Sequence, residues 1–205
     1  MLDVEGFILV GGASRRMGRD KAMLSLGNEP LVVHLARELS GITTRVRAVG
    51  QIIGRDSWPA DLESIPDLHK QWGALGGIHT ALDACHAGSA AIVACDLPFV
   101  SKLLLNRLTE IASCEASRDA IVPIQSDLRP QPLCALYRRL PCLEQVERLI
   151  TAGEHTPRAL LQLVNTRWVP FEEIQDLPNS GDFFFNVNTP ADFEQAQQLF
   201  QSRGL

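Results

Sequence analysis

The sequence predicts an α/β fold with a mostly parallel sheet and helices on both of its faces. Short apolar runs alternate with helical patterns along the chain, which is the rhythm of β–α–β units. One run, AAIVA at 90–94, is apolar throughout, as expected for a strand buried on both faces. The 205 residues are 45% hydrophobic and 21% charged, which is enough apolar material for a sizeable core. We therefore expect one domain over residues 1–205.

The first half supplies alternating strands and helices. The expected strands are at 6–10, 46–49, a weak one at 63–65, and 90–94. The expected helices are at 30–39, at 76–87 and after Ser101. Pro30 suits a first helical turn and Gly41 its stop, while Ser101 is a good N-cap followed by apolar residues at helical spacing.

The second half is less regular. The expected strands are at 120–124, 133–137, 167–171 and 183–187, and the expected helices are at 141–152 and 157–164. A polar loop, QSDLRPQP, separates the first two of these strands. Thr189, Pro190 and Asp192 then open a final helix, with a cap, a proline in the first position and an acid in the first turn.

The charge balance and the sequence pattern argue against several classes of protein. The net charge of -5 argues against nucleic acid as a partner, because duplex-binding proteins carry a basic face. The first residues, MLDVEGF, lack the pattern of a secretory signal, and no apolar run approaches the roughly 18 residues of a membrane span. The five cysteines are widely spaced and are expected to be free thiols. A cytoplasmic protein without a membrane partner is the expectation.

The stretch GFILVGGASRRMGRDKAML at 6–24 suggests a phosphate site. A strand leads into Gly11 and Gly12, and four cations follow between Arg15 and Lys21. Glycines at a strand end let backbone N–H groups approach phosphate oxygens, and cations then neutralise the anion. The spacing fits neither a P-loop nor the dinucleotide fingerprint. A solvated basic turn is the alternative, although such a turn does not need two glycines directly after a buried strand.

Asp96 is the second candidate site residue. It follows the apolar run at 90–94, so it is expected at the carboxyl edge of the sheet, where α/β proteins bind their ligands. A carboxylate beside a triphosphate is a natural Mg²⁺ ligand, since this ion often takes only one or two protein carboxylates. The alternative is an acid at a helix start, but Asp96 lies five residues before the cap Ser101, too early for that role.

The stretch LVGGASRRMGRDKAML resembles the opening motif of the molybdenum cofactor guanylyltransferases, the MobA-like nucleotidyltransferases. Further matches follow in order: GALGGIHTAL, CDLPFV, RPQPLCALY, GEHTPRALL and FNVNTPADF. The resemblance implies a single-domain, Rossmann-like three-layer α/β/α nucleotidyltransferase fold. It also implies transfer of GMP from GTP to the terminal phosphate of molybdopterin, with Mg²⁺ as cofactor and pyrophosphate as the released product. Transient contact with other cofactor-biosynthesis proteins or with molybdoenzymes is a further expectation.

The matched positions imply individual roles. The nucleotide-binding positions are Leu9, Val10, Gly11, Gly12, Lys21, Asp67 and Asp96. The catalytic positions are Arg16, Lys21 and Asp96, and Asp96 is also the implied metal ligand. The positions matched to the molybdopterin side are Asn186 and Asn188. The reaction needs charge neutralisation rather than a general base, because the attacking phosphate is already ionised.

The motifs also show departures, and alternatives stay open. Val10 stands where alanine is commoner, Ala74 stands where proline is usual, and no asparagine is present near 49–50. A CTP-dependent enzyme acting on the same pterin, or one acting on a sugar phosphate, is the enzyme alternative. A non-catalytic nucleotide or cofactor carrier is the alternative of another class. The glycine pair and the Asp20–Lys21 pair favour the guanylyl branch, and Asp96 with Lys21 favours an enzyme.

Overall fold

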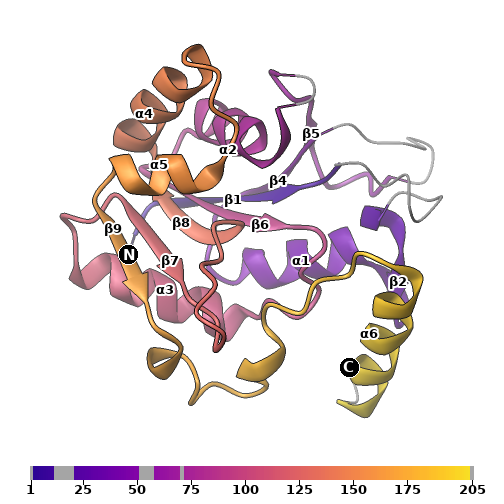
Figure 1. Cartoon of the computed structure of the whole chain (residues 1–205). Helices are drawn as coiled ribbons and strands as arrows, with labels where there is room; N and C mark the ends of the chain where they lie inside the picture. The colour runs from indigo at the N-terminus through magenta and orange to yellow at the C-terminus, as the bar shows by residue number, and fades with distance from the viewer. Residues whose placement is uncertain (1, 12–20, 51–57, 70–71, 204–205) are drawn as a thin grey trace.

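A central sheet organises the chain. The structure is a computed structural model that describes residues 2–11, 21–50, 58–69 and 72–203, and within them seven strands form one sheet in the order β5-β4-β1-β6-β8-β7-β9 (Figure 1). The strands are β1 (Val4–Leu9), β4 (Val46–Val49), β5 (Ser64–Ile65), β6 (Ser89–Ala94), β7 (Ala120–Pro123), β8 (Cys134–Arg138) and β9 (Thr166–Val169). Only β8 runs antiparallel to its neighbours among these strands, so the prediction of a mostly parallel sheet is confirmed.

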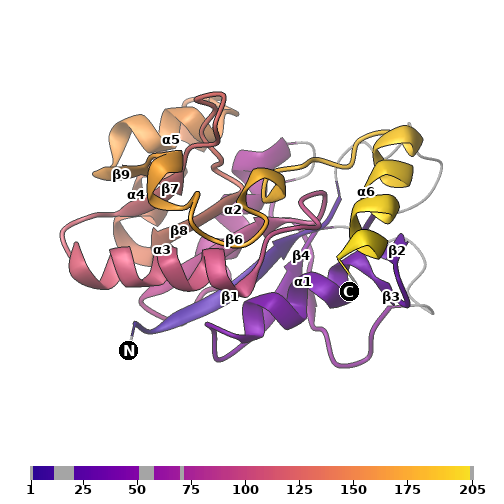
Figure 2. The same cartoon turned by 90° about the horizontal axis from the view of Figure 1, so that it is seen from below.

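Helices cover both faces of the sheet. They are α1 (Leu31–Ser40), α2 (Gly73–Ala84), α3 (Lys102–Cys114), α4 (Arg139–Thr151), α5 (Pro157–Leu163) and α6 (Pro190–Ser202). Figures 1 and 2 show α2, α4 and α5 on one face and α1 and α3 on the other. None of the helices in the described ranges is long and apolar enough to cross a membrane.

Alternation along β1 explains why both faces are covered. Successive side chains of a strand point to opposite faces. Phe7 belongs to the cluster that includes Ile78 of α2 and Val146 of α4. Its neighbour Ile8 belongs to the other cluster, with Leu35 of α1 among its members. The side chains of Phe7 and Ile8 are both fully buried, so β1 needs a helical layer on each side.

A third, smaller apolar cluster holds α6 beside a hairpin instead of the sheet. The hairpin is formed by β2 (Ser25–Leu26) and β3 (Glu29–Pro30), which pair antiparallel (Figure 2). Phe200 of α6, Leu26, Phe99 and Val187 are buried together in this cluster. The cluster therefore joins the segment after Lys21, the loop after β6 and the segment before α6.

The expected strand at 183–187 is wrong. After a short 3₁₀ turn at Ser180–Asp182, this segment pairs with no strand of the described sheet. Phe183 and Val187 are buried in two different apolar clusters, and the N–H of Val187 donates to the carbonyl of Asp96 at 2.9 Å. The apolar residues that suggest a strand are used here to anchor a loop.

Candidate active site

The carboxyl ends of β1, β4, β5 and β6 meet at one edge of the sheet. Leu9 lies opposite both Val49 and Ala94, and Val49 lies opposite Ile65. All four strands are parallel, so the residues that follow them leave the sheet side by side. Asp67 follows β5 and Asp96 follows β6, which brings both predicted carboxylates to this edge.

The end of β1 is fixed by its neighbours. The N–H of Val10 donates to the carbonyl of Val49 at 2.8 Å, and the N–H of Cys95 donates to the carbonyl of Leu9 at 3.1 Å. Gly50 approaches so closely that a Cβ added there would lie 1.7 Å from the Val10 carbonyl oxygen. The strand end that leads into the predicted nucleotide loop is therefore held on both sides by backbone contacts, and Gly11 emerges from it exposed.

Asp96 lies at the centre of the edge. Its side chain is 25% exposed and stands 3.9 Å from the Nζ atom of Lys21. Burial raises the pKa of the Asp96 carboxyl above its ordinary value, and the nearby ammonium of Lys21 offsets that rise only in part. Among the described residues, the charge of this carboxylate is thus compensated only in part.

Lys21 bridges to a distant segment. It begins the short 3₁₀ helix Lys21–Met23, and its Nζ atom donates a 2.9 Å hydrogen bond to Oδ1 of Asn188. The side chain is 16% exposed, so the cation is partly removed from water. Partial burial strengthens the attraction of such a charge for an anion, because the local dielectric constant is lower than that of water.

Asn188 is placed by the cap of α6. The carboxylate of Asp192 accepts from the N–H groups of Asn188 and Thr189 at 2.9 and 2.8 Å, and the N–H of Asp192 donates to Oγ1 of Thr189 at 3.2 Å. These hydrogen bonds hold the pKa of Asp192 below its ordinary value. The predicted start of the final helix is confirmed as a capping box. The cap fixes the backbone on which Asn188 reaches Lys21.

The structure brings three of the sequence-predicted residues together: Lys21, Asp96 and Asn188. Asn186 is exposed two residues earlier, and within the described ranges no hydrogen bond joins it to the other three. Asp67 lies at the same edge but beyond β4; the residue is exposed, and partial removal of its carboxyl from water raises its pKa. The predicted residues Gly12 and Arg16, with the neighbouring Arg15, Arg19 and Asp20, lie outside the described residues.

A group of rings close to Asp67 was not predicted from the sequence. His69 stacks on His79 with ring centroids 5.1 Å apart, and Trp72 stacks on His155 at 4.1 Å. Three of the rings lie within residues 69–79, and only His155 comes from a distant part of the chain. The one local signal is the position of Trp72, directly before the glycine-rich start of α2.

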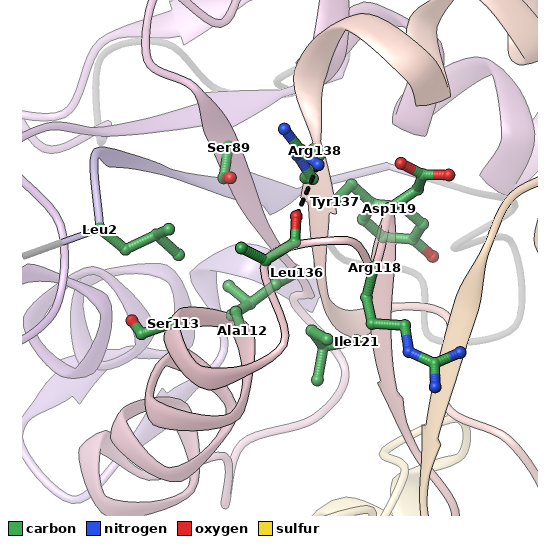
Figure 3. Close-up of a pocket in the computed structure, with 11 residues that line it drawn as sticks. Leu2, Ser89, Ala112, Ser113, Arg118, Asp119, Ile121, Leu136, Tyr137 and Arg138 are labelled. Carbon is green, nitrogen blue, oxygen red and sulfur yellow. Dashed lines mark hydrogen bonds between the residues drawn. The ribbon is translucent and has the colours of Figure 1, made fainter.

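A separate cavity of about 140 Å³ lies at the opposite edge of the sheet. Figure 3 shows part of its wall, with Leu2, Ser89 and Arg138 among the labelled residues. Arg138 ends β8 and donates to the carbonyl of Ala116 at 2.7 Å. Leu2 precedes β1, and Ser89 begins β6. These two residues lie at the amino ends of β1 and β6. None of the sequence-predicted site residues lines this cavity, so it is not the candidate active site.

Comparisons with known proteins identify the family of the chain. The model of the MobA-like NTP transferase domain matches residues 6–169. A probable molybdenum cofactor guanylyltransferase of Pelotomaculum thermopropionicum is 32% identical over 98% of this chain and 96% of its own length. A molybdenum cofactor guanylyltransferase of Desulfosudis oleivorans is 30% identical, with 97% of this chain and 96% of the relative covered.

A solved structure extends the likeness to three dimensions. The molybdopterin-guanine dinucleotide biosynthesis protein A of Archaeoglobus fulgidus superposes with a TM-score of 0.80 and 29% identity. The superposition covers 97% of this chain and 99% of the other. The nucleotidyltransferase fold predicted from the sequence is therefore confirmed. With the domain match and the full-length relatives, these findings show that the chain belongs to the MobA-like NTP transferase family.

Proposed function

We propose that this protein is a guanylyltransferase that moves GMP from GTP to the terminal phosphate of molybdopterin and releases pyrophosphate. The names of its full-length relatives support this choice of nucleotide and acceptor. The observation that carries the proposal is the contact between Lys21, Asp96 and Asn188 at the carboxyl edge of the sheet. It combines a cation, a carboxylate and an amide directly beside the predicted nucleotide loop.

The reaction joins two anions, so the first task of the protein is to lower their repulsion. The Nζ atom of Lys21 can bind the triphosphate and stabilise the charge that develops on the departing pyrophosphate. Arg16 is proposed to share this role from the predicted loop. Leu9, Val10, Gly11 and Gly12 are proposed to contact the nucleotide through their backbones, and Asp67 is proposed to contact it from the end of β5.

The Asp96 carboxylate fits a Mg²⁺ ion. Its pKa is raised and Lys21 compensates its charge only in part, so a divalent cation would stabilise the ionised form. Among the residues that the structure describes, no group of three or more His, Cys, Asp or Glu side chains is arranged to hold a metal. Asp96 would therefore hold Mg²⁺ together with substrate phosphates and water, as this ion prefers. When bound, Mg²⁺ would supply charge neutralisation at the phosphate that is attacked.

The acceptor is proposed to bind on the side of Asn186 and Asn188. Both side chains are exposed at the segment that leads into α6, and both can donate and accept hydrogen bonds with a polar pterin. The acceptor phosphate then needs only to be oriented for in-line attack on the α-phosphate of GTP. It is already ionised near neutral pH, so no side chain has to remove a proton.

A nucleotide screen tests the proposal. The melting temperature is measured with GTP, CTP, ATP and UTP, each with Mg²⁺, because a ligand that binds the folded state stabilises it by about 2.7 kcal/mol at a hundredfold excess over Kd. GTP is expected to give the largest shift. A larger shift with CTP would move the protein to the cytidylyl branch, and no shift with any nucleotide would contradict the proposal.

Turnover is tested by pyrophosphate release from GTP with molybdopterin. Lys21→Ala is expected to lower kcat/KM by about 10²–10³, the usual loss for one electrostatic contact to a transition state. Arg148→Ala is the matched control, because that cation is 66% exposed and forms a surface ion pair with its helix neighbour Glu144. Binding of GTP without pyrophosphate release in the wild type would indicate a carrier instead of an enzyme.

A further inference from the structure

Four rings form a cluster at the edge of the sheet that carries Asp67. Trp72 stacks on His155 with centroids 4.1 Å apart and an interplanar angle of 30°. His69 lies 5.7 Å from the Trp72 ring, and its Nε2 atom is 3.1 Å from Nδ1 of His79. The cluster thus runs from the buried His79 outward to the exposed His155. The proposed roles of the site residues use none of these rings.

The backbone fixes the position of Trp72. It is the residue before α2, and the following Gly73 has a φ of +58°, a conformation that side-chain-bearing residues rarely adopt. The carbonyl of Trp72 accepts from the N–H of Gly76 at 3.3 Å. A Cβ added at Gly76 would lie 2.7 Å from the Cβ of Trp72, so the absence of a side chain there is what admits the tryptophan.

A second set of contacts fixes the segment before Trp72. The N–H of Leu68 donates to Oγ1 of Thr80 at 3.1 Å, and that hydroxyl donates to the carbonyl of Gly76 at 2.9 Å. His79 is adjacent on α2 and 8% exposed. The Asp67–His69 segment is therefore tied to α2, and it carries the His69 ring, which lies tilted by 54° beside the Trp72 ring.

One face of the Trp72 ring is covered by the side chain of His155. His155 is exposed and lies in the loop between α4 and α5. Its backbone is held by the carboxylate of Glu154, which accepts from the N–H groups of His155 and Thr156 at 2.9 Å each. The backbone of the loop is thus fixed, and within the described ranges the stack on Trp72 is the ring contact that the imidazole would lose on rotating away.

We infer that the Trp72 ring is a stacking platform for the heteroaromatic ring of a substrate, and that His155 covers this platform until the substrate ring replaces it. The inference rests on the proposed function, since both substrates of that reaction carry a planar heteroaromatic ring, guanine in GTP and pterin in the acceptor. The present spacing of 4.1 Å leaves no room for a third ring between the two, so the substrate ring takes the place of the imidazole.

Tryptophan fluorescence tests the platform directly. The chain has three tryptophans, Trp58, Trp72 and Trp168. The double variant Trp58→Phe/Trp168→Phe leaves Trp72 as the reporter, and Trp58→Phe/Trp72→Phe leaves the 37% exposed Trp168 as the control for absorption by the probe. The probes are GTP, pterin-6-carboxylate and tripolyphosphate, each with Mg²⁺.

We expect saturable quenching of the Trp72 reporter, beyond that of the Trp168 control, by GTP or by pterin-6-carboxylate and none by tripolyphosphate. The probe that quenches identifies which substrate ring uses the platform. Quenching by neither ring compound, or equal quenching by tripolyphosphate, would overturn the inference. None of these measurements requires turnover, so absent pyrophosphate release would contradict the proposed function and leave the fluorescence result standing.

Affinity provides the second readout. Trp72→Leu is expected to lower the affinity for the ring-bearing ligand roughly 5- to 150-fold, the usual range for one base stacked on an aromatic side chain. Trp72→Phe is expected to keep much of that affinity. His155→Ala is expected to bind that ligand equally well or more tightly, because the cover is gone. A tenfold or greater loss in His155→Ala would overturn the role of His155 as a cover. If Trp72→Leu does not fold, Trp72→Phe and the fluorescence reporter decide.

Discussion

The Nζ atom of Lys21 donates a 2.9 Å hydrogen bond to Oδ1 of Asn188, a residue 167 positions further along the chain. A neutral amide orients the ammonium without cancelling its charge, whereas a carboxylate in the same place would neutralise it. The contact with Asn188 thus adds no negative charge to that of Asp96, which stands 3.9 Å from the ammonium. Asn188 therefore positions Lys21, in addition to the acceptor-binding role proposed for it.

Replacing this amide by a carboxylate should therefore be worse than deleting it. Asn188→Ala loses a hydrogen bond to a charged group and is expected to lower kcat/KM about tenfold or more. Asn188→Asp is expected to lower it further, because it pairs with Lys21 and repels phosphate. Pyrophosphate release from GTP and molybdopterin measures both. Gln198→Glu makes the same change of charge at an exposed position of α6, and its kcat/KM should stay near that of the wild type. If Asn188→Asp proves as active as Asn188→Ala, the carboxylate does not compete with phosphate for Lys21.

Asp96 is expected to destabilise the protein when no ligand is bound. Its pKa is raised, so the folded state favours the protonated carboxyl. The resulting gain in the free energy of unfolding is fully present below the pKa of Asp96 in the unfolded chain, and it is lost as pH rises through the higher pKa in the folded chain. Asp96→Asn should accordingly increase the free energy of unfolding by about 0.5–2 kcal/mol at pH 7, and by less at pH 4.5. Urea unfolding at both pH values measures this.

The same Asp96→Asn variant should lose turnover by at least about 10²–10³, because the amide cannot hold Mg²⁺ as a carboxylate does. Asp61→Asn, at an exposed position, is the matched control for both measurements. Magnesium-dependent activity close to wild type in Asp96→Asn would show that another residue holds the metal.

The His69–His79 pair should make stability depend on mildly acidic pH. Burial lowers the pKa of His79, and the adjacent His69 lowers it further. The folded state therefore prefers the neutral form of His79. The resulting gain in the free energy of unfolding is fully present above the unfolded-state pKa near 6.5, and it is lost as pH falls toward the lower pKa of the folded state. The wild type should lose free energy of unfolding between pH 7.5 and 5.5.

His79→Gln should flatten this loss, because glutamine can keep a hydrogen bond but does not titrate in this range. His86→Gln, at an exposed position shortly after α2, is the control and should follow the wild-type curve. Identical pH dependence in His79→Gln and the wild type would assign the effect to other groups.

Gly50 should be intolerant of even one methyl group. Its φ is +131°, and an added Cβ would lie 1.7 Å from the Val10 carbonyl oxygen. Gly50→Ala is expected to destabilise the protein by about 2–4 kcal/mol and to weaken the binding of GTP, because the end of β1 must move. Gly181→Ala has open space around the added Cβ and should change stability by less than about 0.5 kcal/mol. Thermal unfolding and GTP titration of the two variants provide the comparison.

The sequence predicts most elements because local pattern and burial agree. All six residues of β6 are buried, as the apolar run indicates, and α6 begins at the predicted cap Thr189. The start of α2 is missed by three residues, because the helix begins at Gly73, whose left-handed conformation marks the boundary. The apolar pattern at 183–187 misleads, since burial of Phe183 and Val187 comes from side-chain packing without strand pairing.

The site shows a similar division. The motifs predict Lys21, Asp96 and Asn188 one by one, but their contact depends on α6 and on the third apolar cluster, which only the folded chain brings together. The stack of Trp72 on His155 has no sequence signal of its own, because the two residues lie on separate elements whose packing is a long-range property. Residue types at a site are thus more readable from sequence than their partners.

The attachment of α6 through Phe200 to the β2–β3 hairpin has a consequence for biosynthesis. A ribosome delivers Lys21 and Asp96 well before Asn188, and the sheet can already pair while α6 is still in the exit tunnel. A nascent chain at that stage has the carboxyl edge of the sheet, with Asp96 available to Lys21, but lacks the Asn188 amide that accepts from the Lys21 ammonium. Docking of Phe200 against the hairpin is then the event that completes the site, so competence for chemistry arrives with the last helix.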